Sequence, residues 1–334
     1  MLNFEEFQEF VKEHIRKFLP EELKTANVSL SSITKNNGKN LSAILVRPEE
    51  SYIAPTVYLN EYFNQYENGA DLTELMKEIA KITSQNQVKD TFEDFVQNFQ
   101  NFDAIKDRIV MALVNAEKNQ EMLQTTPHLI KEDLAIIYKV MVDMDGVQDG
   151  ISTVTIHNSH MECWGQDIET LHNLAMENSN RLLPATVLSM DEIMMGVLGE
   201  VPEEMAELMS EHQVDEQMFV VSNKNQVNGA SAIIYSDALS QLAEKFKSDV
   251  YILPSSIHEC IAISVNMGSP EMLAQMVQEI NAMEVDMAEQ LSDHVYHYDA
   301  KAKTLSLADT TAKSLMVSEN QTQAESYTRP RRHR

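Results

Sequence analysis

The sequence predicts an α+β protein in which mainly antiparallel, mixed sheets are flanked by helices. Strands that follow one another closely and only two clear crossover helices in the last third of the chain favour antiparallel pairing. The chain has 334 residues, of which 43% are hydrophobic, so it is long enough to bury a large core. Helix caps and turn signals then place the individual elements.

Residues 1–145 are predicted to form an N-terminal part that begins with a helix. Asn3 and Glu6 have the spacing of a capping box, and Pro20 ends the apolar stripe that follows them. Asn37 and Gly38 suit the positive φ angles of a tight hairpin turn. The other elements predicted in this part are strands at 28–34, 41–46, 54–58, 109–115 and 134–143, and a helix opened by Asp71 and Glu74.

Residues 146–316 are predicted to form a C-terminal α+β part that packs with the first as one compact body. The break between the two parts lies in the Gly-containing segment that starts at Asp145. Residues 317–334 are predicted to be a disordered, polar and basic tail. The predicted strands are 218–222, 230–235, 250–253, 260–265, 295–299 and 304–307, and the predicted helices are 167–183, 236–247 and those that begin after Ser189 and Ser269.

The charge of the chain argues against direct binding of nucleic acid. Its 26 Lys and Arg residues oppose 52 Asp and Glu residues, which gives a formal net charge of −26. Four Arg lie in the last six residues, so the 22 bases and 52 acids of residues 1–328 give −30. Such an excess of carboxylates repels phosphates and favours a basic partner.

The sequence predicts a cytoplasmic protein that neither crosses nor binds a membrane. Two cysteines are too few for a disulfide framework, which fits a reducing compartment. Glu5 and Glu6 stand where a secretory signal would be basic, and no window has the roughly 20 apolar residues of a membrane span. With only nine Gly, the chain also has no phosphate-cradling loop.

Five sequence blocks resemble those of a known bacterial family. They are LPEE at 19–22, PTVYLNEYFNQY at 55–66, LVNAEKNQEML at 113–123, YILPSSIHECIAISVNMG at 251–268 and LSDHVYHYD at 291–299. Together they resemble the bacterial proteins grouped as domain-of-unknown-function family 5688, over about residues 3 to 308. The resemblance implies a cytoplasmic bacterial protein of one architecture. Because the family has no assigned activity, it transfers no catalytic or binding residue.

His157, His160 and Cys163 are the best candidates for metal ligands. On a helix, a spacing of three residues places two imidazoles and a thiolate within one arc of the surface. Zinc, however, takes four ligands, and no second Cys or His pair stands at a fixed spacing. The simpler interpretation is a polar turn that leads into a helix, and the sequence predicts neither a metal nor another cofactor.

A second group of chemically active residues follows a strand of buried type. Ser255, Ser256, His258, Glu259 and Cys260 supply hydroxyl, imidazole, carboxylate and thiol groups within six residues. Nucleophilic catalysis needs a base within hydrogen-bond reach of the nucleophile, and adjacency in the chain does not supply that geometry. These residues are the candidates for a hydrolase-type site, and the alternative is a polar strand connection.

The segment from Leu182 to Asn223 combines nine acidic residues with several methionines and contains no Lys or Arg. Flexible thioethers beside a carboxylate face suit a surface that accepts a basic, apolar partner. The alternative is that the methionines fill the core and the acids form a solvated outer face. The candidate partner-binding residues are Met194, Met195, Glu203, Glu204, Glu207, Met209 and Glu211.

These observations favour a non-enzymatic protein-interaction module with an unknown protein partner of basic character. A narrower form of the hypothesis is mimicry of nucleic-acid charge, in which carboxylates occupy the phosphate-binding groove of another protein. The alternative class is a hydrolase with its site near Ser255–Cys260. The sequence leaves homo-oligomerisation open.

Overall fold

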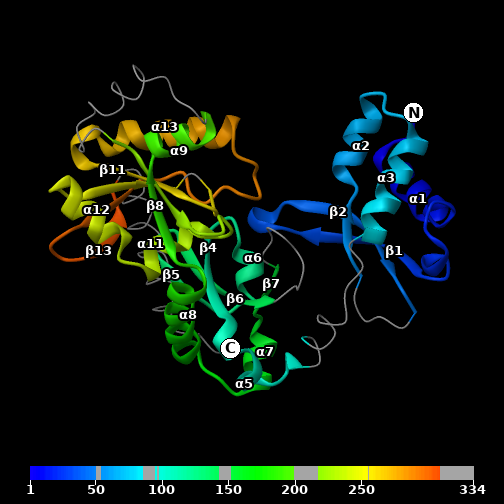
Figure 1. Ribbon diagram of the computed structural model, residues 1–334, viewed down its shortest axis with the longest axis horizontal. Helices are drawn as coiled ribbons and strands as arrows, with labels where there is room; N and C mark the ends of the chain where they lie inside the picture. Colours follow the sequence, from blue (N-terminus) through cyan, green and yellow to red (C-terminus); the bar gives the residue numbers. More distant parts are fainter. Residues whose placement is uncertain are drawn as a thin grey trace, which may run out of the picture. The chain divides into compact units, whose positions relative to one another are not determined.

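The computed structural model describes residues 1–49, 54–85, 95, 98–142, 152–198, 217–254 and 256–308. Within these ranges the chain forms three antiparallel sheets and a set of helices, which confirms the predicted α+β class (Figure 1). The chain divides into two compact units, one built mainly from Met1–Ala104 and the other from Ile105–Met141 and Gln148–Arg334. Each unit is described by itself.

The first unit contains a three-stranded sheet in the order β1-β2-β3. Asn37 and Gly38 have φ angles of 58° and 71°, so the predicted tight turn between the first two strands is confirmed. The register pairs Leu30 with Ile44. The strands are β1 (Asn27–Thr34), β2 (Asn40–Arg47) and β3 (Thr56–Tyr58).

Among the described residues of the first unit, three helices accompany this sheet, and two of them begin at the caps that the sequence predicts. The Asn3 side chain accepts a hydrogen bond from the backbone N–H of Glu6, at 2.9 Å, and Glu6 accepts one from the backbone of Asn3. The Asp71 side chain likewise accepts from the N–H of Glu74, at 3.1 Å. The helices are α1 (Phe4–His14), α2 (Asn60–Glu67) and α3 (Leu72–Gln85).

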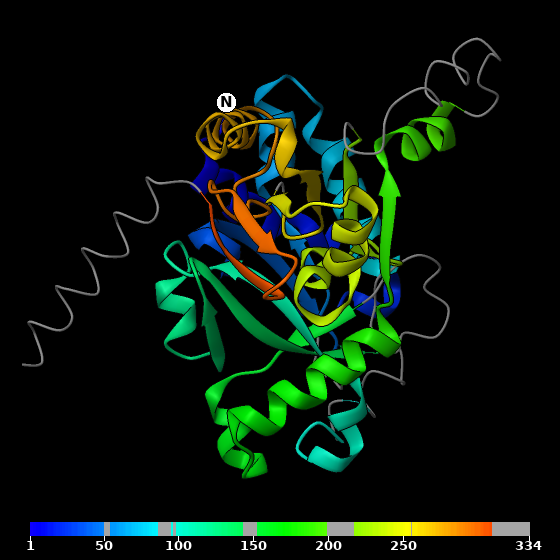
Figure 2. The ribbon, with the colours of Figure 1, turned by 90° about the vertical axis from the view of Figure 1, so that its left-hand side faces the viewer.

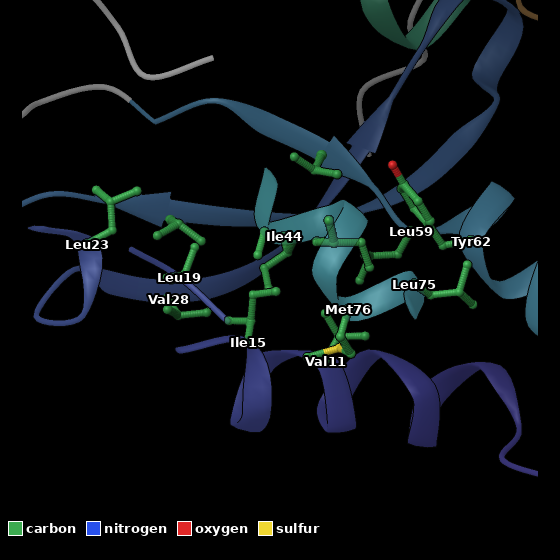
Figure 3. Close-up of a cluster of buried hydrophobic side chains, with 14 of the residues drawn as sticks. Val11, Ile15, Leu19, Leu23, Val28, Ile44, Leu59, Tyr62, Leu75 and Met76 are labelled. Carbon is green, nitrogen blue, oxygen red and sulfur yellow. The ribbon is translucent and has the colours of Figure 1, made fainter. Parts of the chain in front are cut away.

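The core of the first unit lies between α1, α3 and the sheet. Val11 and Ile15 reach upward from the end of α1 toward Ile44 of β2 and Met76 of α3 (Figure 3). All four side chains are almost fully buried. Because each buried aliphatic or thioether side chain contributes roughly 1.5–3 kcal/mol, this cluster explains how so small a sheet is stabilised.

The second unit contains the other two sheets and most of the helices. Its helices are α6 (Gln120–Leu123), α7 (Asn158–Trp164), α8 (Ile168–Leu182), α9 (Met190–Leu198), α11 (Ala232–Tyr235), α12 (Ala238–Phe246) and α13 (Pro270–Met283), with α5 (Phe102–Ile105) at the boundary with the first unit. Its strands are β4 (Ile109–Asn115), β5 (His128–Lys131), β6 (Leu134–Val142), β7 (Ser152–Thr155), β8 (Ala185–Ser189), β9 (Phe219–Asn223), β10 (Val250–Leu253), β11 (Cys260–Ser264), β12 (Tyr296–Asp299) and β13 (Thr304–Leu307). Single 3-10 turns stand at Ile15–Lys17, Glu21–Leu23, Asn36–Gly38, Lys106–Arg108, Gly229–Ser231 and Val265–Met267.

The four-stranded sheet has the order β4-β6-β5, with β7 paired to β6. Its strand β4 is buried along its whole length, as its uninterrupted apolar sequence predicts. Helix α8 fixes this strand through two buried polar side chains. Asn178 donates to the carbonyl oxygen of Ile109 at 3.1 Å, and the Ser179 hydroxyl accepts from the N–H of Met111 at 3.1 Å.

The six-stranded sheet has the order β13-β12-β10-β11-β9-β8 and lies between two helices (Figure 1). Side chains alternate between the faces of a sheet, so neighbouring residues can meet different helices. Leu253 and Ile263 pack with α13 on one face. On the other face, the ring of Phe219 lies 5.5 Å from that of Phe246 on α12.

One predicted strand is wrong. Residues 230–235 form a 3-10 turn (Gly229–Ser231) and the short helix α11, although their apolar run is typical of a strand. A short apolar run does not distinguish a buried strand from a buried helical turn. Asn228, just before this segment, has a positive φ angle of 51°. The strands β5, β7 and β8 are additional to those that the sequence predicts.

The predicted division of the chain after residue 145 stays a prediction, and the predicted tail at 317–334 lies outside the described residues. In the described ranges, every helix is too short or too polar to span a bilayer.

Candidate functional site

The structure does not assemble the predicted metal ligands. His157 precedes α7, and its backbone N–H donates to Nδ1 of His160 at 3.0 Å. This hydrogen bond closes the turn before α7. Burial, together with the neighbouring His157, lowers the pKa of His160. Cys163 is exposed, and among the described residues no three His, Cys, Asp or Glu side chains are placed to hold a metal ion.

The segment after β10 is a tightly bonded connection. Ser256 accepts a hydrogen bond from the backbone N–H of His258 at 3.0 Å, and the His258 carbonyl accepts one from Ser222 at 2.8 Å. The imidazole Nδ1 accepts from the N–H of Asn228 at 3.3 Å, while Nε2 lies 3.9 Å from the Glu289 carboxylate. Distant segments therefore position His258.

The described candidates for a nucleophile and its base are not hydrogen-bonded to each other. The imidazole of His258 contacts Asn228 and Glu289, and among the described residues no hydrogen bond links it to the hydroxyl of Ser256 or to the thiol of Cys260. Cys260 is fully buried, and burial raises the pKa of its thiol. Ser255 lies outside the described residues.

Two cavities in the described part of the second unit lie elsewhere. Neither is lined by Ser256, His258, Glu259 or Cys260. A hydrolase-type site near these residues would need a recess that holds a substrate beside the nucleophile. The hydrolase-type site therefore stays a hypothesis.

Helix α9 carries the described portion of the predicted acidic, methionine-containing surface. Met194 is 43% exposed, and Met195 beside it is half-buried. Glu192 caps the helix, because its carboxylate accepts hydrogen bonds from the backbone and hydroxyl of Ser189 at 2.7 and 2.9 Å. The other candidates, Glu203, Glu204, Glu207, Met209 and Glu211, lie outside the described residues.

Helix α13 presents a second and longer row of exposed apolar side chains. We call this row the methionine stripe; its members recur at intervals of three and four residues, which places them along one side of the helix. Their exposed fractions range from 40% at Met276 to 72% at Met283. The methionine stripe consists of Met272, Met276, Ile280 and Met283.

The neighbouring side of α13 fixes the helix to the six-stranded sheet. Leu273, Ala274 and Val277 are each 5% exposed and pack with Leu253 of β10. At the end of the helix, Asn281 donates to the backbone of Ser292 at 2.9 Å. The sheet therefore covers only part of the apolar surface of α13. The rest, the methionine stripe, remains exposed on a helix that is packed against the sheet.

The chain segment that contains the methionine stripe is acidic. Residues 248–300 contain nine acidic residues and no Lys or Arg. Four of the acids lie on α13 or directly after it, namely Glu271, Glu279, Glu284 and Asp286. Lys118, in the turn before α6, pairs with Asp293 at 3.2 Å. Residues 248–300 therefore carry a net negative charge.

The sequence contains a signal for the methionine stripe, although the only surface predicted from the sequence lies at residues 182–223. Met272, Met276 and Met283 follow the helix cap at Ser269, and the absence of bases extends from Lys247 to Lys301. Methionine, however, is abundant throughout the chain, with 20 residues, and helical methionines usually fill cores. Only the structure separates buried from exposed members.

Within the described residues, three antiparallel sheets and their helices define an α+β protein, and helix α13 exposes a row of apolar side chains. The chain belongs to the family of unknown function DUF5688, which matches residues 4–300. This confirms the family that the five sequence blocks resemble. No curated protein and no solved structure matches the chain.

Proposed function

We propose that the chain is a non-enzymatic protein-interaction module, that its docking surface is the methionine stripe of α13, and that its partner presents a basic amphipathic helix. One observation carries the proposal. Met272, Met276, Ile280 and Met283 are exposed in a row on a helix whose adjacent side is fixed to a sheet. The same stretch of chain has nine acids and no base.

The physical case rests on burial and on charge. Full burial of an exposed large apolar side chain contributes roughly 1.5–3 kcal/mol. The four members of the stripe are 40–72% exposed, so covering them gains part of that free energy for each, against the cost of ordering the two partners. Apolar anchors three and four residues apart match the side chains that another amphipathic helix presents. Methionine adapts to irregular surfaces because its side chain is flexible and polarisable. The surrounding carboxylates steer a basic partner and raise its rate of association.

The exposed Met194 on α9 belongs to a second patch, separate from the methionine stripe. Helices α9 and α13 overlap in the view of Figure 1 but lie apart in Figure 2, where α9 is at the upper right and α13 at the upper left. One short partner helix therefore does not cover Met194 and Met276 together. Since most candidates of the α9 surface lie outside the described residues, α13 is the better supported docking surface.

A cytoplasmic location is part of the proposal. Cys163 is exposed and Cys260 is buried, and both are free thiols. An exposed free thiol is typical of a compartment whose redox buffers keep cysteines reduced. Expression of the chain fused to a reporter that is active only in the cytoplasm would test this part.

The proposal is tested with a synthetic amphipathic peptide that carries Lys on one helical face and Leu on the other. We expect saturable binding by calorimetry that weakens as NaCl rises from about 0.05 M to about 0.5 M. The double variant Met276→Glu/Met283→Glu should bind at least about tenfold more weakly, because it places charge on the stripe. The variant Met276→Leu/Met283→Leu keeps the apolar surface and should bind like the parent chain.

Met194→Glu is the matched control, because Met194 and Met276 have nearly equal exposed fractions, 43% and 40%. The proposal expects this variant to bind the peptide normally. Loss of binding in Met194→Glu with retention in the α13 double variant would move the surface to α9. Light scattering that shows a stable dimer, dissociated by Met276→Glu/Met283→Glu, would instead make a second copy of the chain the occupant of the stripe.

A further inference from the structure

A cavity of about 510 Å³ lies within the second unit, away from the methionine stripe. Its walls come from β5, α8, the α11–α12 pair and the β12–β13 hairpin, which lie near one another in Figure 1. The volume is that of a pocket for a small molecule. Most of its wall is apolar and includes Leu129, Ile136, Met176, Ile233, Leu239 and Leu305.

Hydroxyl and imidazole groups interrupt the apolar wall. The Ser240 hydroxyl on α12 lies 2.6 Å from the Tyr298 hydroxyl on β12, and both residues line the cavity. His172 on α8 lines it as well, with Nδ1 3.1 Å from the hydroxyl of the buried Tyr138. These contacts hold the polar groups in fixed positions, which gives the cavity a few oriented polar groups in an apolar surround.

Two lysines give the cavity a charge opposite to that of the protein. Lys131 ends β5 and Lys303 lies in the β12–β13 turn, with a positive φ angle of 54°. Within the described part of the chain, neither ammonium group forms an ion pair with a carboxylate. Asp237 is the one acid in the lining. A lining with two bases and one acid stands out in a chain of net charge −26.

We propose that this cavity binds a small amphipathic anion, with an apolar body against the aliphatic wall and a carboxylate or phosphate head group at Lys131 and Lys303. The aliphatic wall gains free energy by excluding water from the ligand's apolar body. The two ammonium groups supply charge-assisted hydrogen bonds to the head group. The net negative charge of the chain repels anions at long range. The local positive charge of the two lysines offsets this repulsion at the cavity and selects a negative ligand.

Calorimetry with decanoate, decyl phosphate and decanol tests this assignment on the full chain. We expect saturable binding of at least one anion, and binding of uncharged decanol that is at least about tenfold weaker. The anion with the lower Kd identifies the head group. Replacing both bases in Lys131→Gln/Lys303→Gln should weaken anion binding by about tenfold or more, whereas Lys131→Arg/Lys303→Arg should restore it.

Lys301→Gln is the matched control, because Lys301 lies in the same turn as Lys303, is exposed and does not line the cavity. This variant should bind the anion like the parent chain. The location is checked independently by methionine methyl NMR, in which decanoate should shift the resonance of Met176. Absence of saturable binding, an equal loss in Lys301→Gln, or methyl shifts confined to the methionine stripe would each overturn the proposal.

Discussion

Tyr296 of β12 donates its phenolic hydrogen to the carboxylate of Asp133, in the turn between β5 and β6. Ser292 donates to the same carboxylate at 2.6 Å. Burial, and then the charge of Asp133, hold the pKa of Tyr296 well above its ordinary value, so its hydroxyl remains a donor. This buried group joins the four-stranded sheet to the six-stranded sheet that carries α13.

Tyr296→Phe should lower the free energy of unfolding by about 1–3 kcal/mol, because it removes a donor from a buried carboxylate. Urea unfolding measures this change. Tyr251→Phe is the control, since Tyr251 is half-buried on the opposite face of the same sheet; its effect should stay within about 0.5 kcal/mol. Equal effects of the two substitutions would contradict the role of Asp133.

Gly229→Ala should destabilise the second unit by about 1–3 kcal/mol, because the segment before α11 is closely packed. A methyl group at Gly229 would overlap the Ser222 hydroxyl and the His258 carbonyl oxygen. Gly196→Ala on α9 is the control, because its methyl group meets no atom within 4 Å, and it should be neutral or stabilising. A thermal melt in which both variants resemble the parent chain would show that this segment can relax.

Only one of the two cysteines should react with Ellman's reagent in the native protein. Cys163 is exposed, whereas Cys260 is buried, and burial followed by the charge of Glu259 raises the pKa of its thiol. We expect one fast thiol, lost in Cys163→Ser, and a second thiol that reacts only after unfolding. Rapid reaction of Cys260 in folded protein would support the hydrolase interpretation.

Stability should fall as the pH is lowered from about 7.5 to about 5.5, through the ordinary histidine pKa of about 6.5. Burial lowers the pKa of His172, and burial with the nearby His157 lowers that of His160. In this pH range the unfolded chain therefore binds more protons than the folded chain, so protonation favours unfolding. The double variant His160→Gln/His172→Gln should show a flatter dependence of unfolding free energy on pH. An unchanged slope would contradict the assignment.

Local signals in the sequence predict much of the fold. The caps at Asn3 and Asp71 and the turn at Asn37-Gly38 depend on residues a few positions apart, and the structure confirms them. The contact of Asp133 with Tyr296 spans 163 positions, and no periodicity signals it. The strand predicted at residues 230–235 is wrong because a short apolar run shows no periodicity that separates a buried strand from a buried helix.

The surface that the sequence predicts at residues 194–211 stays a prediction, and the structure adds a second candidate on α13. The combination of acids, methionines and missing bases is visible in the sequence at residues 182–223 and again at 248–300. Exposure, however, depends on which side of a helix the sheet covers. Val277 and Met276 are adjacent in the chain, yet their exposed fractions are 5% and 40%.

Methionine methyl NMR during titration with the basic amphipathic peptide is the most direct test of the proposed function. The chain has 20 methionines, which act as reporters across the molecule. We expect the methyl resonances of Met272, Met276 and Met283 to shift together and to saturate at one peptide per chain. The methyl resonance of Met194 should stay unchanged. Shifts confined to Met194, or no saturable shift at the stripe, would contradict the proposed function.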